Sequence, residues 1–126
     1  MNLPTLTIAS GNSRKVSEIS EMLDVLTLKV KKQPDSLNVE ETGSTYFDNA
    51  LLKAKAASLA TKTWTLADDS GLEVDFLDGR PGIYSARYAK TNIEKLKKLI
   101  NELSETPYRS AKFISCLLYT SDAADE

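Results

Sequence analysis

The feature that most constrains this chain is an acidic pair in the stretch of residues 63–89. An apolar run ends abruptly in Asp68 and Asp69, and we expect a Ser-Gly turn to follow and lead into a second β-prone run, residues 72–77. Burying an ionised carboxylate is costly, so adjacent carboxylates persist beside a core only where cations or hydrogen-bond donors balance them. A divalent metal with a phosphate ligand is a common balance. The pattern alone also fits a solvated turn, in which Asp and Ser bond to nearby backbone groups.

The composition fits one globular domain with neither a membrane nor a nucleic-acid partner. The chain has 126 residues, a net charge of -2 and 41% hydrophobic residues, enough for one core. An extended phosphate-binding surface needs a basic excess, which is lacking here. No apolar run approaches membrane-spanning length and no export signal is recognisable at the start, so we expect a cytoplasmic protein.

The chain contains no histidine and one cysteine, Cys116. A single cysteine cannot form an intramolecular disulfide, which suits a reducing compartment. Without histidine, Ser-His and Cys-His nucleophiles and His-ligated zinc are excluded, so acid-base chemistry falls to carboxylates, Lys or Tyr. Abundant oxygen ligands favour magnesium, calcium or manganese.

A strand, a tight loop and an amphipathic helix are predicted at the start of the chain. Residues 3–9 are β-prone and uncharged, and apolar residues at helical spacing follow in residues 16–26. The loop between them, residues 10–15, joins a Ser-Gly-Asn turn to two cationic side chains. Free N–H groups at a helix start attract anions, so this loop is a candidate phosphate site. The same turn also suits an ordinary strand-to-helix link, and it is not a Walker loop.

A second acidic pair, Glu40 and Glu41, precedes the next predicted helix. The spacing from Thr45 to Asp48 fits a helix capping box. Lys53 flanks the apolar stripe of this helix, where a lysine usually lies on the solvated face. In a βαβ unit, a right-handed crossover brings loops at the same sheet edge near one another, so the two acidic pairs could converge on one metal.

The rest of the chain completes an α/β pattern. Residues 27–33 alternate as a strand with one wet face, residues 78–82 form a turn, and residues 110–119 form a last strand. Between them, a helix with a capping box from Thr91 to Glu94 ends near Ser104. We expect an α/β fold, and the family resemblance described next implies a long mixed central sheet flanked by helices.

Four motifs, in the right order, resemble those of the non-canonical purine nucleoside triphosphate pyrophosphatases, the inosine triphosphate pyrophosphatase family. They are Ser-Gly-Asn with a following lysine at residues 10–15, Glu-Glu-Thr-Gly and Asn-Ala-x-x-Lys-Ala within residues 40–54, Ala-Asp-Asp-Ser-Gly-Leu at residues 67–72, and Pro-Gly-Ile-Tyr-Ser-Ala-Arg-Tyr at residues 81–88. The likeness covers about residues 6–113.

This resemblance implies a magnesium-dependent hydrolysis of ITP, dITP and XTP to the monophosphate and pyrophosphate, which cleanses the nucleotide pool. It also implies a homodimer for the intact protein and a fold like that of inosine triphosphate pyrophosphatase. By the same resemblance Glu40 and Asp69 bind Mg²⁺, Asp69 is the catalytic base, and Glu41 and Asp68 are supporting acids. The residues implied to bind the nucleoside triphosphate are Ser10, Gly11, Asn12, Ser13, Arg14, Lys15, Lys53 and Ser70.

The sequence departs from the family pattern toward its end. The later base-binding blocks, Phe-Gly-Tyr-Asp-Pro, a lysine and Ser-His-Arg, do not occur in these 126 residues. Residues 116–126 resemble a translated sequencing adapter, so we expect a non-native tail there. We expect residues 1–115 to be the N-terminal part of a single pyrophosphatase domain, incomplete at the C-terminus. The chain alone is then expected to be weakly active or inactive and to lack base selectivity.

Two other functions also fit the pattern. A non-catalytic nucleotide or polyphosphate-binding module would keep the loop at residues 10–15 but would not release pyrophosphate with magnesium. A Maf-like nucleotide pyrophosphatase would share the architecture and act on other nucleotides, including pyrimidines. The motifs at residues 67–72 and 81–88 favour the inosine triphosphate pyrophosphatase family over the Maf-like one.

Overall fold

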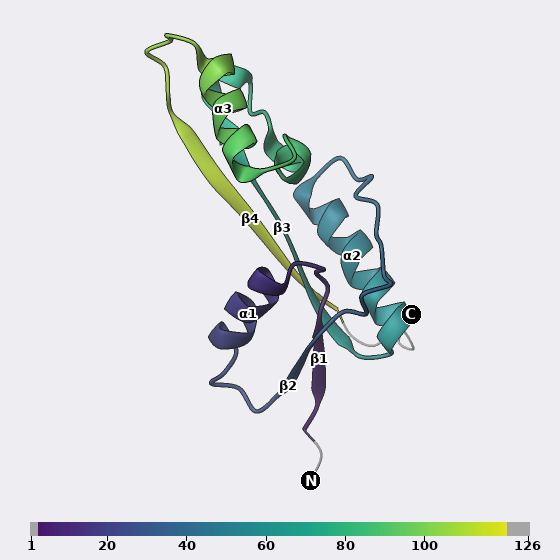
Figure 1. Ribbon diagram of the computed structural model, residues 1–126. Helices are drawn as coiled ribbons and strands as arrows, with labels where there is room; N and C mark the ends of the chain where they lie inside the picture. The colour runs from purple at the N-terminus through teal and green to yellow at the C-terminus, as the bar shows by residue number, and fades with distance from the viewer. Residues whose placement is uncertain (1–2, 121–126) are drawn as a thin grey trace. The chain divides into compact units, whose positions relative to one another are not determined.

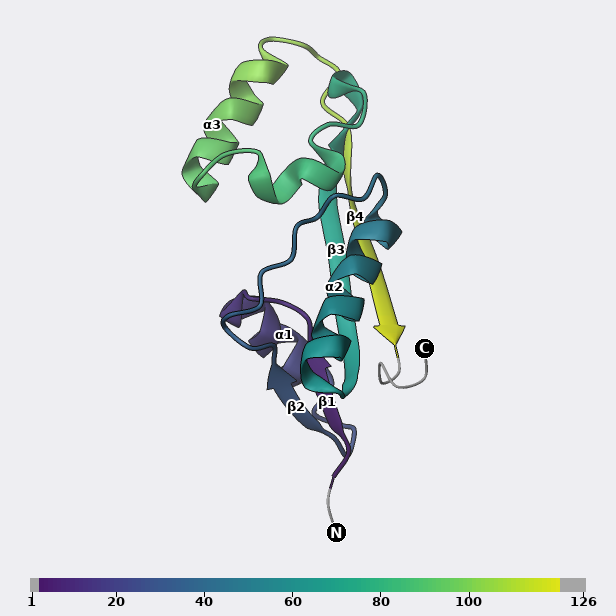
Figure 2. The same cartoon turned by 90° about the vertical axis from the view of Figure 1, so that its right-hand side faces the viewer.

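The computed structural model describes residues 3–120 and confirms the expected α/β fold. In order, the elements are β1 (Thr5–Ile8), α1 (Ser13–Met22), β2 (Lys29–Lys32), α2 (Tyr46–Thr61), β3 (Trp64–Val74), the 3-10 helices η1 (Asp75–Leu77) and η2 (Gly82–Arg87), α3 (Asn92–Leu103) and β4 (Ala111–Thr120) (Figure 1). The four-stranded sheet has the order β2-β1-β3-β4. β1 pairs in parallel with β2 and with β3, whereas β4 runs opposite to β3 (Figure 2).

The chain divides into two compact units, Met1–Asp68 with Leu117–Glu126, and Asp69–Cys116. In the first unit, β1 is the buried strand that the sequence predicts. Leu6 and Ile8 are 5% and 1% exposed, and Leu6 pairs with Val30 on one side and Trp64 on the other. No helix within residues 3–120 has the length and apolarity needed to cross a membrane.

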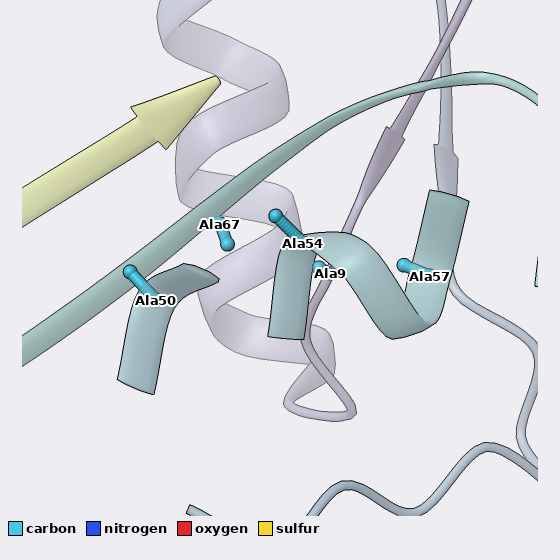
Figure 3. Packing of buried hydrophobic residues seen from close by; sticks show 5 residues of the cluster. All are labelled: Ala9, Ala50, Ala54, Ala57 and Ala67. Atoms are coloured by element: carbon cyan, nitrogen blue, oxygen red, sulfur yellow. The ribbon is translucent and has the colours of Figure 1, made fainter. Parts of the chain in front are cut away.

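Small side chains form the core of the first unit. Ala50, Ala54 and Ala57 of α2 pack against Ala9, after β1, and Ala67 of β3 (Figure 3). Methyl groups on both sides let the helix backbone come close to the strands, and the interior fills without large side chains. This packing fixes α2 against the strands that carry the candidate site.

Both expected helix starts are confirmed. The Thr45 hydroxyl accepts the N–H of Asp48 at 3.0 Å at the start of α2. The Thr91 hydroxyl accepts the N–H of Glu94 at 3.1 Å at the start of α3. Each bond satisfies a donor that has no partner inside its helix, an effect of ~1 kcal/mol.

The second unit has its own apolar cluster. Val74 of β3, Leu77 of η1 and Leu103 of α3 form its buried part, with Leu72 and Leu99 packed against them. The three buried residues come from the end of a strand, a 3-10 helix and the end of a helix, so the cluster fixes α3 on the last part of β3.

The predicted Ser-Gly turn after Asp68 and Asp69 is wrong. β3 runs through both acids and through Gly71 without a break, and the second β-prone run ends early because residues 75–77 form η1. Gly71 is needed for a different reason: a Cβ there would lie 2.2 Å from the carbonyl oxygen of Gly82. The glycine makes room for a neighbouring segment while its own backbone stays in the strand.

β4 confirms the predicted last strand and continues into the segment expected to be a non-native tail. Leu118 packs against the alanine core of the first unit, and the ring of Tyr119 lies edge-on to Trp64 with 5.1 Å between ring centroids. Residues 121–126 of that tail lie outside the described residues. The boundary between residues 115 and 116 stays a prediction.

Candidate active site

Four of the predicted site residues form one contact network in the first unit. Nζ of Lys15 lies 3.0 Å from Oδ2 of Asp68, and Nζ of Lys53 lies 2.9 Å from Oε1 of Glu41. Lys53 also donates to the backbone carbonyl of Asp68 at 2.6 Å. Residues from α1, the loop before α2, α2 itself and β3 therefore meet around Asp68. We call these four residues the lysine-acid network.

The lysine-acid network is partly shielded from solvent. The side chains of Asp68, Lys53 and Glu41 are 11%, 17% and 21% exposed. Carboxylates with so little contact with water need cationic partners, which the two lysines provide. The prediction that an acidic pair near the core would be balanced by cations therefore holds for Asp68.

Lys53 caps an open backbone position of β3. The β1–β3 pairing ends at Ile8 and Leu66, after which the N–H of Ala9 donates to the Leu66 carbonyl at 2.9 Å. Successive residues of a strand direct their N–H and C=O groups to alternate edges, so the Asp68 carbonyl faces the same edge as that of Leu66. Lys53 occupies this edge as a donor. The expectation from helical spacing alone, that Lys53 lies on the solvated face, is wrong.

The predicted phosphate loop is a capped helix start. Oδ1 of Asn12 accepts the N–H groups of Arg14 at 3.0 Å and Lys15 at 3.3 Å, and Oγ of Ser10 accepts the N–H of Asn12 at 3.1 Å. Two of the amides at the start of α1 are thus engaged by a side chain of the same loop. The remaining members of the predicted loop are exposed: Gly11, Ser13 and Arg14. Phosphate binding at this loop stays a prediction.

Glu40, Asp69 and Ser70 are the remaining predicted site residues. Glu40 is exposed in the loop before α2, where its carbonyl accepts the N–H of Thr42 at 3.1 Å. Asp69, the first residue of the second unit, is 6% exposed in β3, and the next residue, Ser70, is exposed. Within residues 3–120, no group of three or more His, Cys, Asp or Glu side chains forms a metal cluster. The metal-binding roles of Glu40 and Asp69 stay predictions.

Asn49 is an anchor of the site that the sequence reasoning missed. It is 0% exposed, and its Oδ1 accepts the N–H of Gly43 at 2.7 Å, which ties the loop carrying Glu41 to α2. A Cβ at Gly43 would lie 2.6 Å from Cβ of Asp48. A polar residue among the alanines on the buried face of α2 was the available signal, because buried polar groups are usually hydrogen-bonded.

A sequence profile of the Ham1 family matches residues 6–126. The chain belongs to the Ham1 family. Two curated relatives of this Ham1 chain carry the name dITP/XTP pyrophosphatase. The protein of Synechococcus sp. strain CC9311 is 54% identical over 112 residues, which cover 89% of this chain and 54% of the relative. The Synechocystis protein is 46% identical over 112 residues, which cover 89% of this chain and 58% of the relative. The Ham1 chain thus spans little more than half the length of these two relatives.

Two solved structures of Ham1 proteins share the fold. The Coxiella burnetii protein matches with a TM-score of 0.86 at 35% identity, over 98% of this chain and 66% of its own. The Staphylococcus aureus protein matches with a TM-score of 0.79 at 39% identity, over 93% of this chain and 63% of its own. These matches confirm the fold and, with the named relatives, the resemblance seen in the four motifs.

Proposed function

We propose that the protein to which this chain belongs hydrolyses dITP, ITP and XTP to the corresponding monophosphate and pyrophosphate. The observation that carries the proposal is the lysine-acid network, because it joins residues of three separate motifs at one place. The relatives named dITP/XTP pyrophosphatase support the choice of substrate.

The residues of the chain suit this chemistry. A triphosphate brings several negative charges, and the ammonium groups of Lys15 and Lys53 offset charge on the departing pyrophosphate. We assign Asp69 as the base that takes a proton from the attacking water, a role that a carboxylate can fill without histidine. Asp68 and Glu41 hold the two lysines in place until the substrate enters.

Mg²⁺ is the cofactor in this proposal, with Glu40 and Asp69 as the residues that would hold it. Both offer carboxylate oxygens, the donors that Mg²⁺ prefers. When bound, the ion offsets phosphate charge. The other two acids, Asp68 and Glu41, already contact lysine ammonium groups, which favours a supporting role for them.

The proposal includes the setting of the intact protein. The net charge of -2 gives no basic excess for a nucleic-acid partner, and we propose a cytoplasmic homodimer that acts on free nucleotides.

The test measures products. The purified chain, and a chimera in which it replaces the matching segment of the Synechococcus relative, are each incubated with dITP and Mg²⁺, and pyrophosphate and orthophosphate are measured separately. We expect the chimera to release pyrophosphate together with monophosphate, and the chain alone to be much slower. Lys15→Ala should lower the rate in the chimera by about tenfold or more, and the exposed Lys55→Ala should not change it.

Other outcomes would favour the other functions. A folded chimera that binds dITP without hydrolysis contradicts the proposal and supports a binding module. Faster hydrolysis of a pyrimidine triphosphate than of dITP supports the Maf-like alternative. Release of orthophosphate alone contradicts both pyrophosphatase readings.

A further inference from the structure

β3 extends beyond the end of its pairing with β1. The register ends at Ile8 and Leu66, whereas β3 continues to Val74. Because strand residues alternate between two edges, the N–H of Leu72 faces the same edge as the carbonyl of Leu66. A backbone donor there needs another partner, since unpaired N–H groups away from water are costly.

The hydroxyl of Ser85 in η2 is that partner. Its Oγ accepts the N–H of Leu72 at 2.9 Å and donates to the carbonyl of Gly82 at 2.6 Å. A hydroxyl can donate and accept at once, so this one group joins β3 to the start of η2. We call this arrangement of Gly71, Leu72, Gly82 and Ser85 the Ser85 clamp.

Two glycines allow the Ser85 clamp to close. A Cβ at Gly71 would lie 2.2 Å from the Gly82 carbonyl oxygen and 2.9 Å from Oγ of Ser85. Gly82 has a φ of 53°, in the left-handed region that favours glycine. The Pro-Gly-Ile-Tyr-Ser segment is therefore shaped to lie against Gly71 rather than to form only a surface turn.

We propose that Ser85 is a positioning residue, which fixes the backbone of Asp69 and Ser70 through the Ser85 clamp. Asp69 and Ser70 directly precede Gly71 in β3, so a shift of the clamped backbone moves them too. This inference rests on the proposed function for its catalytic consequence, because Asp69 is the assigned base. Displacing a reacting group by ~1 Å can cost about 100-fold in rate.

The first test is amide hydrogen exchange of the 126-residue chain, read residue by residue by NMR. In Ser85→Ala, exchange at Leu72 should rise by about three- to tenfold, the loss expected for one hydrogen bond. The amide of Val74, which bonds to the Arg80 carbonyl at 3.2 Å, should keep its rate. Ser85→Thr, which keeps a hydroxyl, should restore protection at Leu72.

Ser110→Ala is the matched control. It also removes a hydroxyl in the second unit, one that donates to Oδ2 of Asp75 at 2.5 Å. The amide resonances of Asp69 and Ser70 should shift in Ser85→Ala and stay in place in Ser110→Ala. Equal acceleration at Leu72 and Val74 would show that Ser85 only stabilises the unit as a whole, and no acceleration would show that the clamp holds nothing. Either result overturns the inference.

The second test is kinetic. In the Synechococcus chimera with dITP and Mg²⁺, Ser85→Ala should lower kcat by about tenfold or more while KM stays within about twofold, and Ser85→Thr should recover kcat. A rise in KM at constant kcat would contradict positioning. If the chimera without a substitution at Ser85 releases no pyrophosphate, that failure belongs to the proposed function, and the exchange and resonance measurements decide the positioning role.

Discussion

Nζ of Lys15 lies 3.0 Å from Oδ2 of Asp68, so the first turn of α1 is joined to the middle of β3. The two residues are 53 positions apart and belong to different motifs. Parallel pairing of β1 with β3 makes the contact possible, because it places the loop after β1 beside the residues that follow Leu66. The cation of one motif and the acid of another are thus in direct contact.

Removing the ammonium group of Lys15 should destabilise the chain more than removing one from a surface pair. Asp68 is 11% exposed, so Lys15→Met leaves a shielded carboxylate without this cation, and we expect a loss of about 1–2 kcal/mol in the free energy of unfolding. The control is Lys32→Met, because its partner Asp35 is 92% exposed and the expected loss is about 0.5 kcal/mol or less. Urea denaturation followed by circular dichroism measures both. Equal losses would contradict the structural role of the Lys15–Asp68 pair.

Lys53 should matter more for stability than its exposed neighbour on α2. Lys53→Met removes contacts to Glu41 and to the Asp68 carbonyl and should cost about 2 kcal/mol. Lys55→Met, on the solvated face of the same helix, should change the free energy of unfolding by less than about 0.5 kcal/mol. The same denaturation measurement compares them. A Lys53→Met chain as stable as the Lys55→Met chain would show that the contacts of Lys53 with Glu41 and with the Asp68 carbonyl contribute nothing to stability.

A methyl group at Gly43 should disturb the loop that carries Glu41. It would lie 2.6 Å from Cβ of Asp48 and 2.8 Å from Oδ1 of Asn49, so Gly43→Ala should cost about 1–3 kcal/mol through strain and a weakened hydrogen bond. At Gly11 a Cβ would be 3.8 Å from the nearest atom, in the side chain of Gln33. Gly11→Ala is therefore the matched control. A thermal melt in which Gly43→Ala matches Gly11→Ala would exclude the tight contact.

The hydroxyl of Tyr88 should lose its proton at a higher pH than an ordinary tyrosine. Burial, and then the 2.5 Å hydrogen bond to Glu102 and its charge, raise the pKa of Tyr88 from 10.0 to about 12, against the opposing charge of Arg80. Nζ of Lys98 lies 4.3 Å from the centroid of the Tyr88 ring. Between these two pH values the folded chain keeps a proton that the unfolded chain loses. The contribution of Tyr88 to stability is therefore complete below pH 10 and decreases as the pH rises toward 12.

Ultraviolet absorbance of tyrosinate measures this titration, with Tyr88→Phe as the difference reference. Glu102→Gln removes the negative charge and should lower the pKa of Tyr88 toward its ordinary value. An unchanged titration in that variant would show that Glu102 does not hold the proton.

The sequence predicted helix starts correctly where a short pattern of neighbouring residues determines the local structure. Thr45 and Thr91 each precede an acidic residue at the capping spacing, and both begin a helix. Ser70 and Gly71 gave the wrong prediction of a turn because turn propensity is a local signal. The strand continues through them because a distant segment, held by Ser85, lies against Gly71.

The same distinction applies to the candidate site. The motifs placed Lys15 and Asp68 among the site residues, and the strand-helix-strand order brings them into contact. Helical spacing alone predicted that Lys53 lies on the surface. Lys53 instead donates to the backbone carbonyl of Asp68, which is available because β3 continues beyond the end of its pairing with β1. The availability of this carbonyl depends on the lengths of β1 and β3. No residue near Lys53 in the sequence indicates those lengths.

The most direct measurement is the rate of pyrophosphate release from dITP by the Synechococcus chimera carrying Asp69→Asn. With Asp69 as the base, kcat should fall by about 100-fold or more, while Asp24→Asn, at an exposed position after α1, keeps the parent rate. A folded Asp69→Asn chimera that releases pyrophosphate as fast as its parent would contradict the assignment of Asp69 and the mechanism built on it.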